Sequence, residues 1–567
     1  MAFFLPYVFT RITNEHYEFP KAFLVYGVGA TLVLLFFIYL WFQSSQFVYV
    51  NKLVLVFLLA QILSTITSSH LYTSLWGYYS RFNDGLLVIL IFGLLFFVVS
   101  NLLNLDLHYR LWKCIALSTM PVSLFAIFQH VKGVERVYST FGQPNWLAAY
   151  LVMAIPLILY TVEKAPTKGL KGFWGIVLVL SIITLFYTKS LSGILALVLQ
   201  LSIFFVVRLR TTRRRLLGGI LLFALGAIML AGPLSNRILD AFNLSGAASS
   251  YNVSDSGYIR LGIWRGSLRL ALNSPKNFLL GTGLETFPYR FPFFRENSLN
   301  FSSEWDFILN KPHNYYIEAL VETGLVGFIS YLALILWSLR IKNLYVVLGL
   351  LGYYVTNLFG FPTIHTSLLF WLLLAFEQPV SRFSVGRYRG PLLVGALTSY
   401  VLFIFFVTKF FVAELYFSAA KSSVSFKDAH RAVSLNKYEP AYMRQLAKIY
   451  ISNDEPELAT LALKDAVNLN SDNLATLRNI VPVYALAALL DINQPFIESN
   501  LDDSRVVTAR HYYVYLKNTY ANDLGILADI AEQEKKLGLG EDFEITYKMA
   551  KDLRSDIVEW HPSFSRD

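Results

Sequence analysis

The feature that most constrains this sequence is a series of long apolar segments. Hydrophobic residues make up 55% of the 567 residues, and the mean hydropathy is +0.49. A helix needs about 17 to 25 apolar residues to cross a bilayer core about 30 Å thick. We expect membrane helices at 22–42, 51–67, 85–103, 111–129, 146–163, 172–188, 192–208, 216–232, 315–338, 343–360, 363–377 and 391–413. The sequence therefore predicts an all-α polytopic membrane protein with about twelve transmembrane helices.

The loops between these segments differ in charge. Three loops on one side of the predicted membrane carry basic clusters: Lys164, Lys168 and Lys171; Arg208, Arg210, Arg213, Arg214 and Arg215; Arg382, Arg387 and Arg389. Basic loops tend to stay in the cytoplasm. We therefore predict a membrane domain, 1–413, in the cytoplasmic (inner or plasma) membrane. Its polar loop, 233–314, and a C-terminal domain, 414–567, are expected outside the cytoplasm.

The net charge of +10 is unevenly distributed. Residues 414–567 carry 17 Lys and Arg against 23 Asp and Glu, so the positive excess belongs to the membrane domain. This distribution fits membrane topology, and we expect no nucleic-acid partner.

The C-terminal region contains an internal repeat. AVSLNKYEPAYMRQLAKIY begins at Ala432, and AVNLNSDNLATLRNIVPVY begins 34 residues later at Ala466. This period is typical of tetratricopeptide repeats, whose helical hairpins form peptide-binding or packing surfaces. We therefore expect a peptide or protein partner for this domain. The alternative is a helical bundle unrelated to such repeats.

The polar loop carries an aromatic and basic helix. Residues 258–272 are expected to be helical, with Arg260, Trp264 and Arg265 on one face. Guanidinium groups of this kind can fork onto phosphate oxygens. The alternative is an anchor at the membrane surface without a ligand.

His313 is the second candidate in this loop, because it comes just before the helix expected to begin near Tyr315. Free N–H groups at a helix N-terminus attract anions and favour neutral imidazole. His313 and Asn314 are therefore candidates for proton transfer and substrate binding, with an ordinary surface histidine as the alternative. Glu318 and Glu322 follow on one helical face, where carboxylates tend to face a cavity or a partner.

Three short segments on the same predicted side add polar groups. They contain Arg81, Asn145 and Lys189. A basic pocket at the membrane surface suits a phosphate-bearing lipid. Glu304 and Asp306 are the nearest approach to a metal motif, but two acids in a polar loop are more often solvated, so we expect neither a metal nor a cofactor.

Five motifs in order resemble a known family: FGQPN, TKSLSG, an Arg and a Trp spaced by three residues, GTG, and HNYYIEALVETGLVGF. Over about residues 20–413 the chain resembles the O-antigen ligase and polymerase family, which includes protein O-oligosaccharyltransferases. Such proteins are similar to GT-C glycosyltransferases. The resemblance implies an undecaprenyl diphosphate-linked glycan donor, and it implies that His313 is the essential loop histidine and Arg260 the diphosphate-binding arginine.

One position departs from the family pattern. The turn TKSLSG carries Leu191 where the family commonly has Arg. Lys189 and Arg81 are the candidates to supply the missing charge, although a lysine lacks the planar fork of a guanidinium.

The expected function is glycan transfer to an acceptor outside the cytoplasm. That acceptor is a glycan, a lipid or a protein, and the predicted repeats favour a protein. A polysaccharide polymerase is the main alternative. A transporter of lipid-linked glycan and a membrane-anchored scaffold are the others, but we find no pair of interrupted spans in matching halves, as transporters often have.

Overall fold

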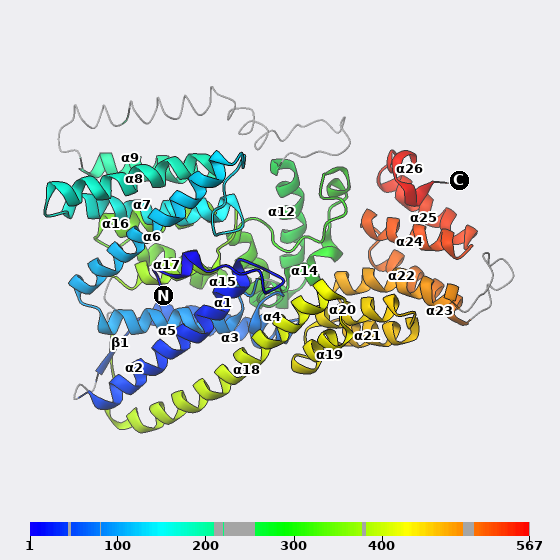
Figure 1. The fold of residues 1–567 in the computed structure, drawn as a ribbon, viewed down its shortest axis with the longest axis horizontal. Coiled ribbons are helices and arrows are strands. Elements are labelled where there is room, and N and C mark those ends of the chain that lie inside the picture. The colour runs from blue at the N-terminus through cyan, green and yellow to red at the C-terminus, as the bar shows by residue number, and fades with distance from the viewer. Residues whose placement is uncertain are drawn as a thin grey trace. The chain divides into compact units, whose positions relative to one another are not determined.

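The computed structural model describes residues 1–43, 47–79, 81–208, 219, 256–376, 381–490 and 504–565. These residues are helical apart from loops and one two-stranded antiparallel sheet (Figure 1). Strand β1 (Phe47–Val50) pairs with β2 (Ser381–Ser384), with Val50 opposite Ser381. The predicted all-α class is confirmed, with this short sheet as an addition.

Among the residues that the structure describes, seven helices are long and apolar enough to cross a membrane, which confirms a polytopic membrane protein. The first joins α1 (Glu18–Leu24), a π-helical turn and α2 (Ala30–Phe42) into one rod. The others are α6 (Leu105–Val131), α7 (Pro144–Lys164), α8 (Lys168–Tyr187), α9 (Leu191–Arg208), α15 (Tyr315–Ser338) and α18 (Arg389–Ser423).

Four other predicted spans form shorter helices: α3 (Lys52–Ile66), α5 (Leu86–Leu102), α16 (Leu344–Asn357) and α17 (Ile364–Leu374). The length expected for 363–377 was wrong, because α17 has 11 residues and is too short to cross a bilayer by itself. All of its residues are buried, so its apolar character reflects a place in the protein core. The predicted span 216–232 lies outside the described residues.

The chain divides into two compact units. The described part of the first comprises residues 1–208, 279–285 and 313–411 with the gaps given above, and that of the second comprises 256–278, 286–312, 412–490 and 504–565. The polar loop thus supplies most of its described residues to the unit that contains the C-terminal helices. Helix α18 continues without interruption through residue 413, where the sequence suggested a domain boundary.

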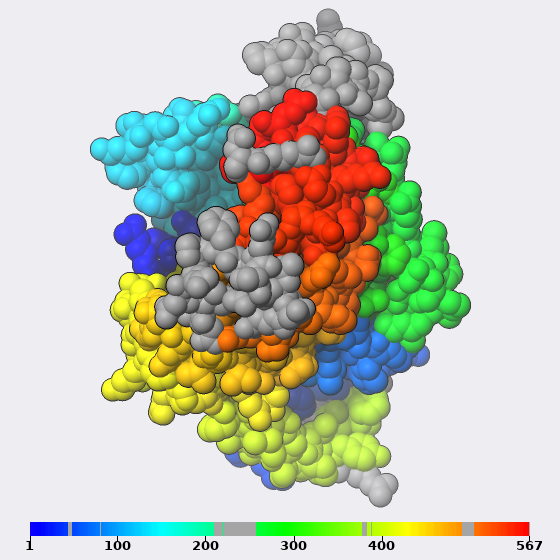
Figure 2. Space-filling model, turned by 90° about the vertical axis from the view of Figure 1, so that its right-hand side faces the viewer, coloured from blue at the N-terminus to red at the C-terminus, as the bar shows by residue number. Residues whose placement is uncertain are grey.

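Antiparallel helices fill the C-terminal part of the second unit. They are α19 (Phe426–Leu435), α20 (Pro440–Ser452), α21 (Pro456–Leu469), α22 (Leu474–Leu490), α23 (Ser504–Thr519), α24 (Leu524–Lys536), α25 (Gly540–Leu553) and α26 (Ile557–Trp560). Successive helices pack on one another, and Figure 2 shows their surfaces in chain order from yellow to red. Asn436 and Asn470, one 34-residue period apart, both cap helix C-termini.

Two backbones meet at glycines in the first unit. Thr282 N–H donates to the Val321 carbonyl and Gly283 N–H to the Glu322 carbonyl, both at 2.9 Å. These carbonyls are free to accept because α15 is broken at Gly324, which has φ +63° and ψ −171°. Gly281 has φ +77°, and a Cβ there would overlap the backbone of Glu322 and Thr323. The GTG motif is therefore the part of the loop that docks onto a kinked helix.

The close approach at Gly281 predicts that Gly281→Ala will prevent normal folding. The added methyl group meets backbone atoms that have no room to move, and alanine disfavours positive φ. Gly133 is a matched control, because its φ is +86° but a Cβ there has no atom within 4 Å. Gly133→Ala should cost about 1 kcal/mol from backbone strain alone. Thermal unfolding and yield of monodisperse protein in detergent measure both effects, and equal behaviour of the two variants would contradict the docking.

Glu439 begins α20 and accepts a hydrogen bond from Ala441 N–H at 3.1 Å. It is 5% exposed, and burial raises its pKa to about 7. Asn473 holds the equivalent place one period later and caps α22 through Thr476 N–H. A neutral side chain is therefore sufficient for this cap.

A raised pKa in the folded state means that protonated Glu439 stabilises the fold, and this contribution is lost as the pH rises toward 7. We expect the opening free energy of α20 to fall by about 2 kcal/mol between about pH 5.5 and about pH 7.5. Glu439→Asn, which copies the next repeat, should remove this dependence. Hydrogen exchange of peptides from 436–452, corrected for the intrinsic effect of pH, measures it. A slope that survives in Glu439→Asn would assign the pH dependence to another group.

Candidate functional site

His313 lies immediately before the N-cap of α15, as the sequence predicted. Asn314 is that N-cap, and its Oδ1 accepts hydrogen bonds from Tyr316 N–H at 3.0 Å and Ile317 N–H at 3.2 Å. His313 has φ +54°, and its ring centroid lies 5.8 Å from that of Phe361. The side-chain oxygen of Asn314 thus fixes the start of α15. The imidazole of His313 therefore lies directly before this helix start.

Arg81 lies against the same aromatic ring as His313. Its Cζ is 5.0 Å from the Phe361 ring centroid and 5.4 Å from that of Trp146, distances at which a cation is attracted to a ring face. Its Nη1 is buried and has no hydrogen-bond partner among the described residues. We call Arg81, Trp146, Phe361 and His313 the aromatic cage. A buried guanidinium nitrogen held in this way is suited to an anionic ligand.

The structure does not place Lys189 and Asn145 in the aromatic cage. Lys189 Nζ forms an ion pair with Glu135 Oε1 at 2.9 Å, and both side chains are exposed. Asn145 Oδ1 accepts a hydrogen bond from Arg136 Nη2 at 3.2 Å. Both candidates are therefore linked to one loop, at Glu135 and Arg136.

Arg136 is a residue that the sequence analysis missed. Its Nε donates to the Thr188 carbonyl at 3.1 Å, which brings its guanidinium to the turn that contains Leu191. The Val137 N–H to Tyr187 carbonyl bond, 3.2 Å, joins the same two segments. In the sequence, only its position shortly before FGQPN could have marked Arg136 as a candidate. Arg136 and Thr188 are 52 residues apart, so the sequence gave no reason to pair them.

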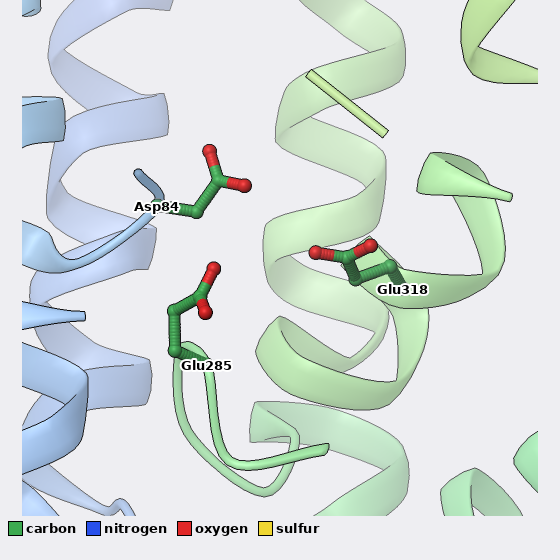
Figure 3. Close-up of side chains that lie close together, drawn as sticks. All are labelled: Asp84, Glu285 and Glu318. Carbon is green, nitrogen blue, oxygen red and sulfur yellow. The ribbon is translucent and has the colours of Figure 1, made fainter. Parts of the chain in front are cut away.

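Three buried carboxylates face one another near α15 (Figure 3). Asp84 precedes α5, Glu285 follows the GTG turn and Glu318 lies in the first turns of α15, and the ligand oxygens of all three lie within 4.8 Å of one another. Glu322 Oε2 accepts from Glu285 N–H at 2.8 Å. Glu318 and Glu322, which the sequence placed on one helical face, are both buried, whereas Asp84 and Glu285 lie in turns that gave no periodic signal.

These carboxylates have two chemical options. Asp84, Glu318 and Glu322 line a cavity of about 20 Å³, room for about one water-sized particle. Carboxylate oxygens at this spacing can surround a divalent cation, or they can share protons because closely spaced like charges do not all ionise. Glu304 and Asp306, the pair weighed from the sequence, lie elsewhere, and Asp306 forms an ion pair with Arg478 at 2.7 Å.

Arg260 and Arg265 lie on α12 (Ser256–Leu272) in the second unit, which confirms the predicted helix. Arg260 is half-buried and Arg265 is exposed. Burial raises the pKa of the Glu304 carboxyl, while the positive charges of Arg295 and Arg260 oppose this shift. Trp264 Nε1 donates to the Pro312 carbonyl at 2.9 Å, so α12 is joined directly to the residue before His313.

Comparison with known families identifies part of this chain. The family model described as O-Antigen ligase matches residues 176–332, which include α12, the GTG turn, His313 and Glu318. No curated protein sequence matches the chain.

Proposed function

This chain carries a domain of the O-antigen ligase family at residues 176–332, and we propose that it transfers a glycan from undecaprenyl diphosphate to an acceptor outside the cytoplasm. The aromatic cage is the observation that carries this proposal. A diphosphate is a dense anion, and the buried Arg81 Nη1 has no hydrogen-bond partner among the described residues. Aromatic rings that hold the guanidinium also suit the sugar and lipid that flank such a diphosphate.

The proposed reaction exchanges one glycosidic bond for another. An acceptor hydroxyl attacks the anomeric carbon of the donor sugar, the bond from that carbon to the diphosphate oxygen breaks, and the lipid diphosphate leaves with the bonding electrons. The hydroxyl proton passes to the imidazole of His313. Arg81 neutralises the negative charge that grows on the leaving oxygen. Such a donor lowers the activation free energy by about 3 to 4 kcal/mol.

Arg260 is proposed as a second diphosphate-binding residue. It is a half-buried guanidinium on a helix whose Trp264 is hydrogen-bonded to the carbonyl that precedes His313. A planar guanidinium can engage two phosphate oxygens at once. Arg265, exposed on the same helix, is proposed to meet the lipid phosphate at the membrane surface.

Arg136 replaces Lys189 in our proposal for the turn that lacks an arginine at Leu191. Arg136 brings a guanidinium to the Thr188 carbonyl, and a guanidinium has the planar fork that the Lys189 ammonium lacks. Asn145 then acts by orienting Arg136 through the 3.2 Å hydrogen bond.

The proposal also covers the side of the membrane on which the C-terminal helices lie and the kind of acceptor that receives the glycan. The C-terminal helices are proposed to be tetratricopeptide-like and extracytoplasmic, as is the polar loop, on the grounds of the 34-residue period and the basic loops. Mass spectrometry of the product distinguishes a protein, lipid or glycan acceptor. A transporter would move the donor without forming a new glycosidic bond.

The aromatic cage predicts that Arg81→Gln and His313→Asn lose transfer activity. The protein is assayed in nanodiscs with undecaprenyl diphosphate glycan extracted from the source cells. Arg81→Gln removes the cation and should slow transfer about 100- to 1,000-fold. Asn accepts the positive φ of residue 313, so His313→Asn removes the imidazole without backbone strain and should cost about 100- to 10,000-fold.

Arg110, an exposed arginine of α6, supplies the control Arg110→Gln. If both cage variants transfer glycan at the wild-type rate, the cage is not the site. If the wild-type protein leaves the donor intact, the result favours a scaffold or a transporter over a glycan-transferring enzyme.

Arg260 and Arg269 form a matched pair on α12. Arg269 is exposed and forms an ion pair with Glu296 at 2.9 Å. We expect Arg260→Gln to slow transfer at least about 100-fold because it loses a phosphate-binding group, while Arg269→Gln stays within a few-fold of wild type. Initial rates at several donor concentrations measure both, and equal losses would point to a general effect of positive charge on α12.

A further inference from the structure

Residues 290–308 of the polar loop lie against the C-terminal helices, within one compact unit. Phe293 stacks on Tyr520 with ring centroids 5.1 Å apart, and Arg290 forms an ion pair with Asp472 at 2.6 Å. Both partners lie in turns at the ends of C-terminal helices. We call residues 290–308 the docked segment.

The middle of the docked segment is held by hydrogen bonds. Asn300 is fully buried, and its Nδ2 donates to the Asn522 carbonyl at 3.0 Å. Its own carbonyl accepts from the buried Arg554 at 3.0 Å. Arg295 donates to three carbonyls of residues 304, 305 and 307, so the segment is also folded on itself.

The end of the docked segment is held by one arginine and one glycine. Arg478 of α22 donates to Asp306 Oδ1 at 2.7 Å and to Asp529 Oδ2 of α24 at 2.6 Å. Gly525 of α24 lies so close that a Cβ there would overlap Asp306 Oδ1. Asp306 therefore fits a site formed by two C-terminal helices.

The docked segment in turn supports α12. Gly266 packs so closely that a Cβ there would overlap the Phe294 carbonyl oxygen, and a Cβ on Gly262 would lie 3.0 Å from Leu299. Five residues then lead from Asp306 to Pro312, whose carbonyl accepts a hydrogen bond from Trp264 Nε1 of α12. The C-terminal helices thus bind the docked segment, which packs against α12. The same segment leads directly into residues 309–312, which precede His313.

We propose that the C-terminal helical domain binds the chain's own residues 290–308. This binding positions α12, which carries Arg260, and the segment that leads to His313. Arg478 and Asp306 are positioning residues that act through α12 and through the segment before His313. The peptide on this face of the domain is internal, so the partner expected from the repeat is supplied by the chain itself. This inference rests on the proposed glycan transfer for its activity readout, while its structural readout is independent of that transfer.

Gly525→Ala tests the proposal without changing a charge. Its methyl group displaces Asp306, whereas Gly540→Ala on α25 is a control because a Cβ there meets no atom within 4 Å. The full-length protein in nanodiscs is assayed with extracted undecaprenyl diphosphate glycan. We expect Gly525→Ala to lower kcat about 10- to 100-fold, as misplacement of a reactive group by about 1 Å does. KM for the donor should rise by a smaller factor than kcat falls, because Arg81 in the aromatic cage is unchanged and only the support of the helix that carries Arg260 is disturbed.

Hydrogen exchange of residues 296–312 is the second readout. We expect faster exchange of this segment in Gly525→Ala than in wild type or Gly540→Ala. Unchanged exchange overturns the docking whether or not the protein transfers glycan. Faster exchange with unchanged kcat overturns the positioning role alone. A wild-type protein without transfer activity refutes the proposed function, while the exchange result still decides the docking.

A double-mutant cycle assigns the effect to one contact. Asp306→Asn, Arg478→Gln and the double variant should show losses of kcat that are not additive, because both changes break the same ion pair. Arg510→Gln is the control, since Arg510 pairs with Asp542 at 2.6 Å inside the helical domain. Additive losses, or an equal loss in Arg510→Gln, would overturn the positioning role.

Discussion

The close contact of the GTG backbone with the broken helix α15 is the constraint on which the membrane unit's site depends. Without a Cβ at Gly281 and with the break at Gly324, the carbonyls of residues 321 and 322 are open to the loop. This contact places Glu285 beside Glu318 and fixes the helix that begins beside His313. The GTG sequence (281–283) and the ETG sequence (322–324) therefore pack directly against each other. This contact fixes the positions of the buried carboxylates and of the start of α15 beside His313.

Two cations inside the membrane unit, Lys21 and Arg81, differ in their surroundings. Buried Glu18 has Lys21 Nζ at 3.5 Å and accepts from Ile364 N–H at 2.9 Å, and Lys21 also donates to the Thr140 carbonyl. Such compensation is what a low-dielectric interior demands of a structural ion. Arg81 differs, because its guanidinium faces aromatic rings and its Nη1 has no hydrogen-bond partner among the described residues. That contrast in surroundings is why Arg81, and not Lys21, is our proposed ligand-binding cation.

Much of this arrangement was predictable where the signal is periodic or local. Hydropathy predicted the long helices, the 34-residue period aligned Asn436 with Asn470, which both cap helix C-termini, and the helix predicted to begin near Tyr315 does begin there. Length alone misjudged α17, because a fully buried core helix and a lipid-facing helix are equally apolar.

Contacts between turns far apart in the chain left no signal. Arg136 and Thr188 are 52 residues apart, and Asp306 and Arg478 are 172 apart. Each of these residues looks like ordinary loop chemistry, and only folding brings it to its partner. The sequence therefore identified His313 and Arg81 as candidates but gave no means of seeing that they share the ring of Phe361.

The polar loop also depends on the C-terminal helices for its core. Phe287, Phe291 and Leu299 are fully or almost fully buried, and burial of such side chains contributes about 1.5 to 3 kcal/mol each. A short loop has too little apolar surface to bury these groups by itself. Packing against the C-terminal helices, with Phe293 on Tyr520 after α23 and Asp306 on Gly525 of α24, extends that core. The described loop residues and the C-terminal helices therefore belong to one compact unit, although α15, α16, α17 and most of α18 separate them in the sequence.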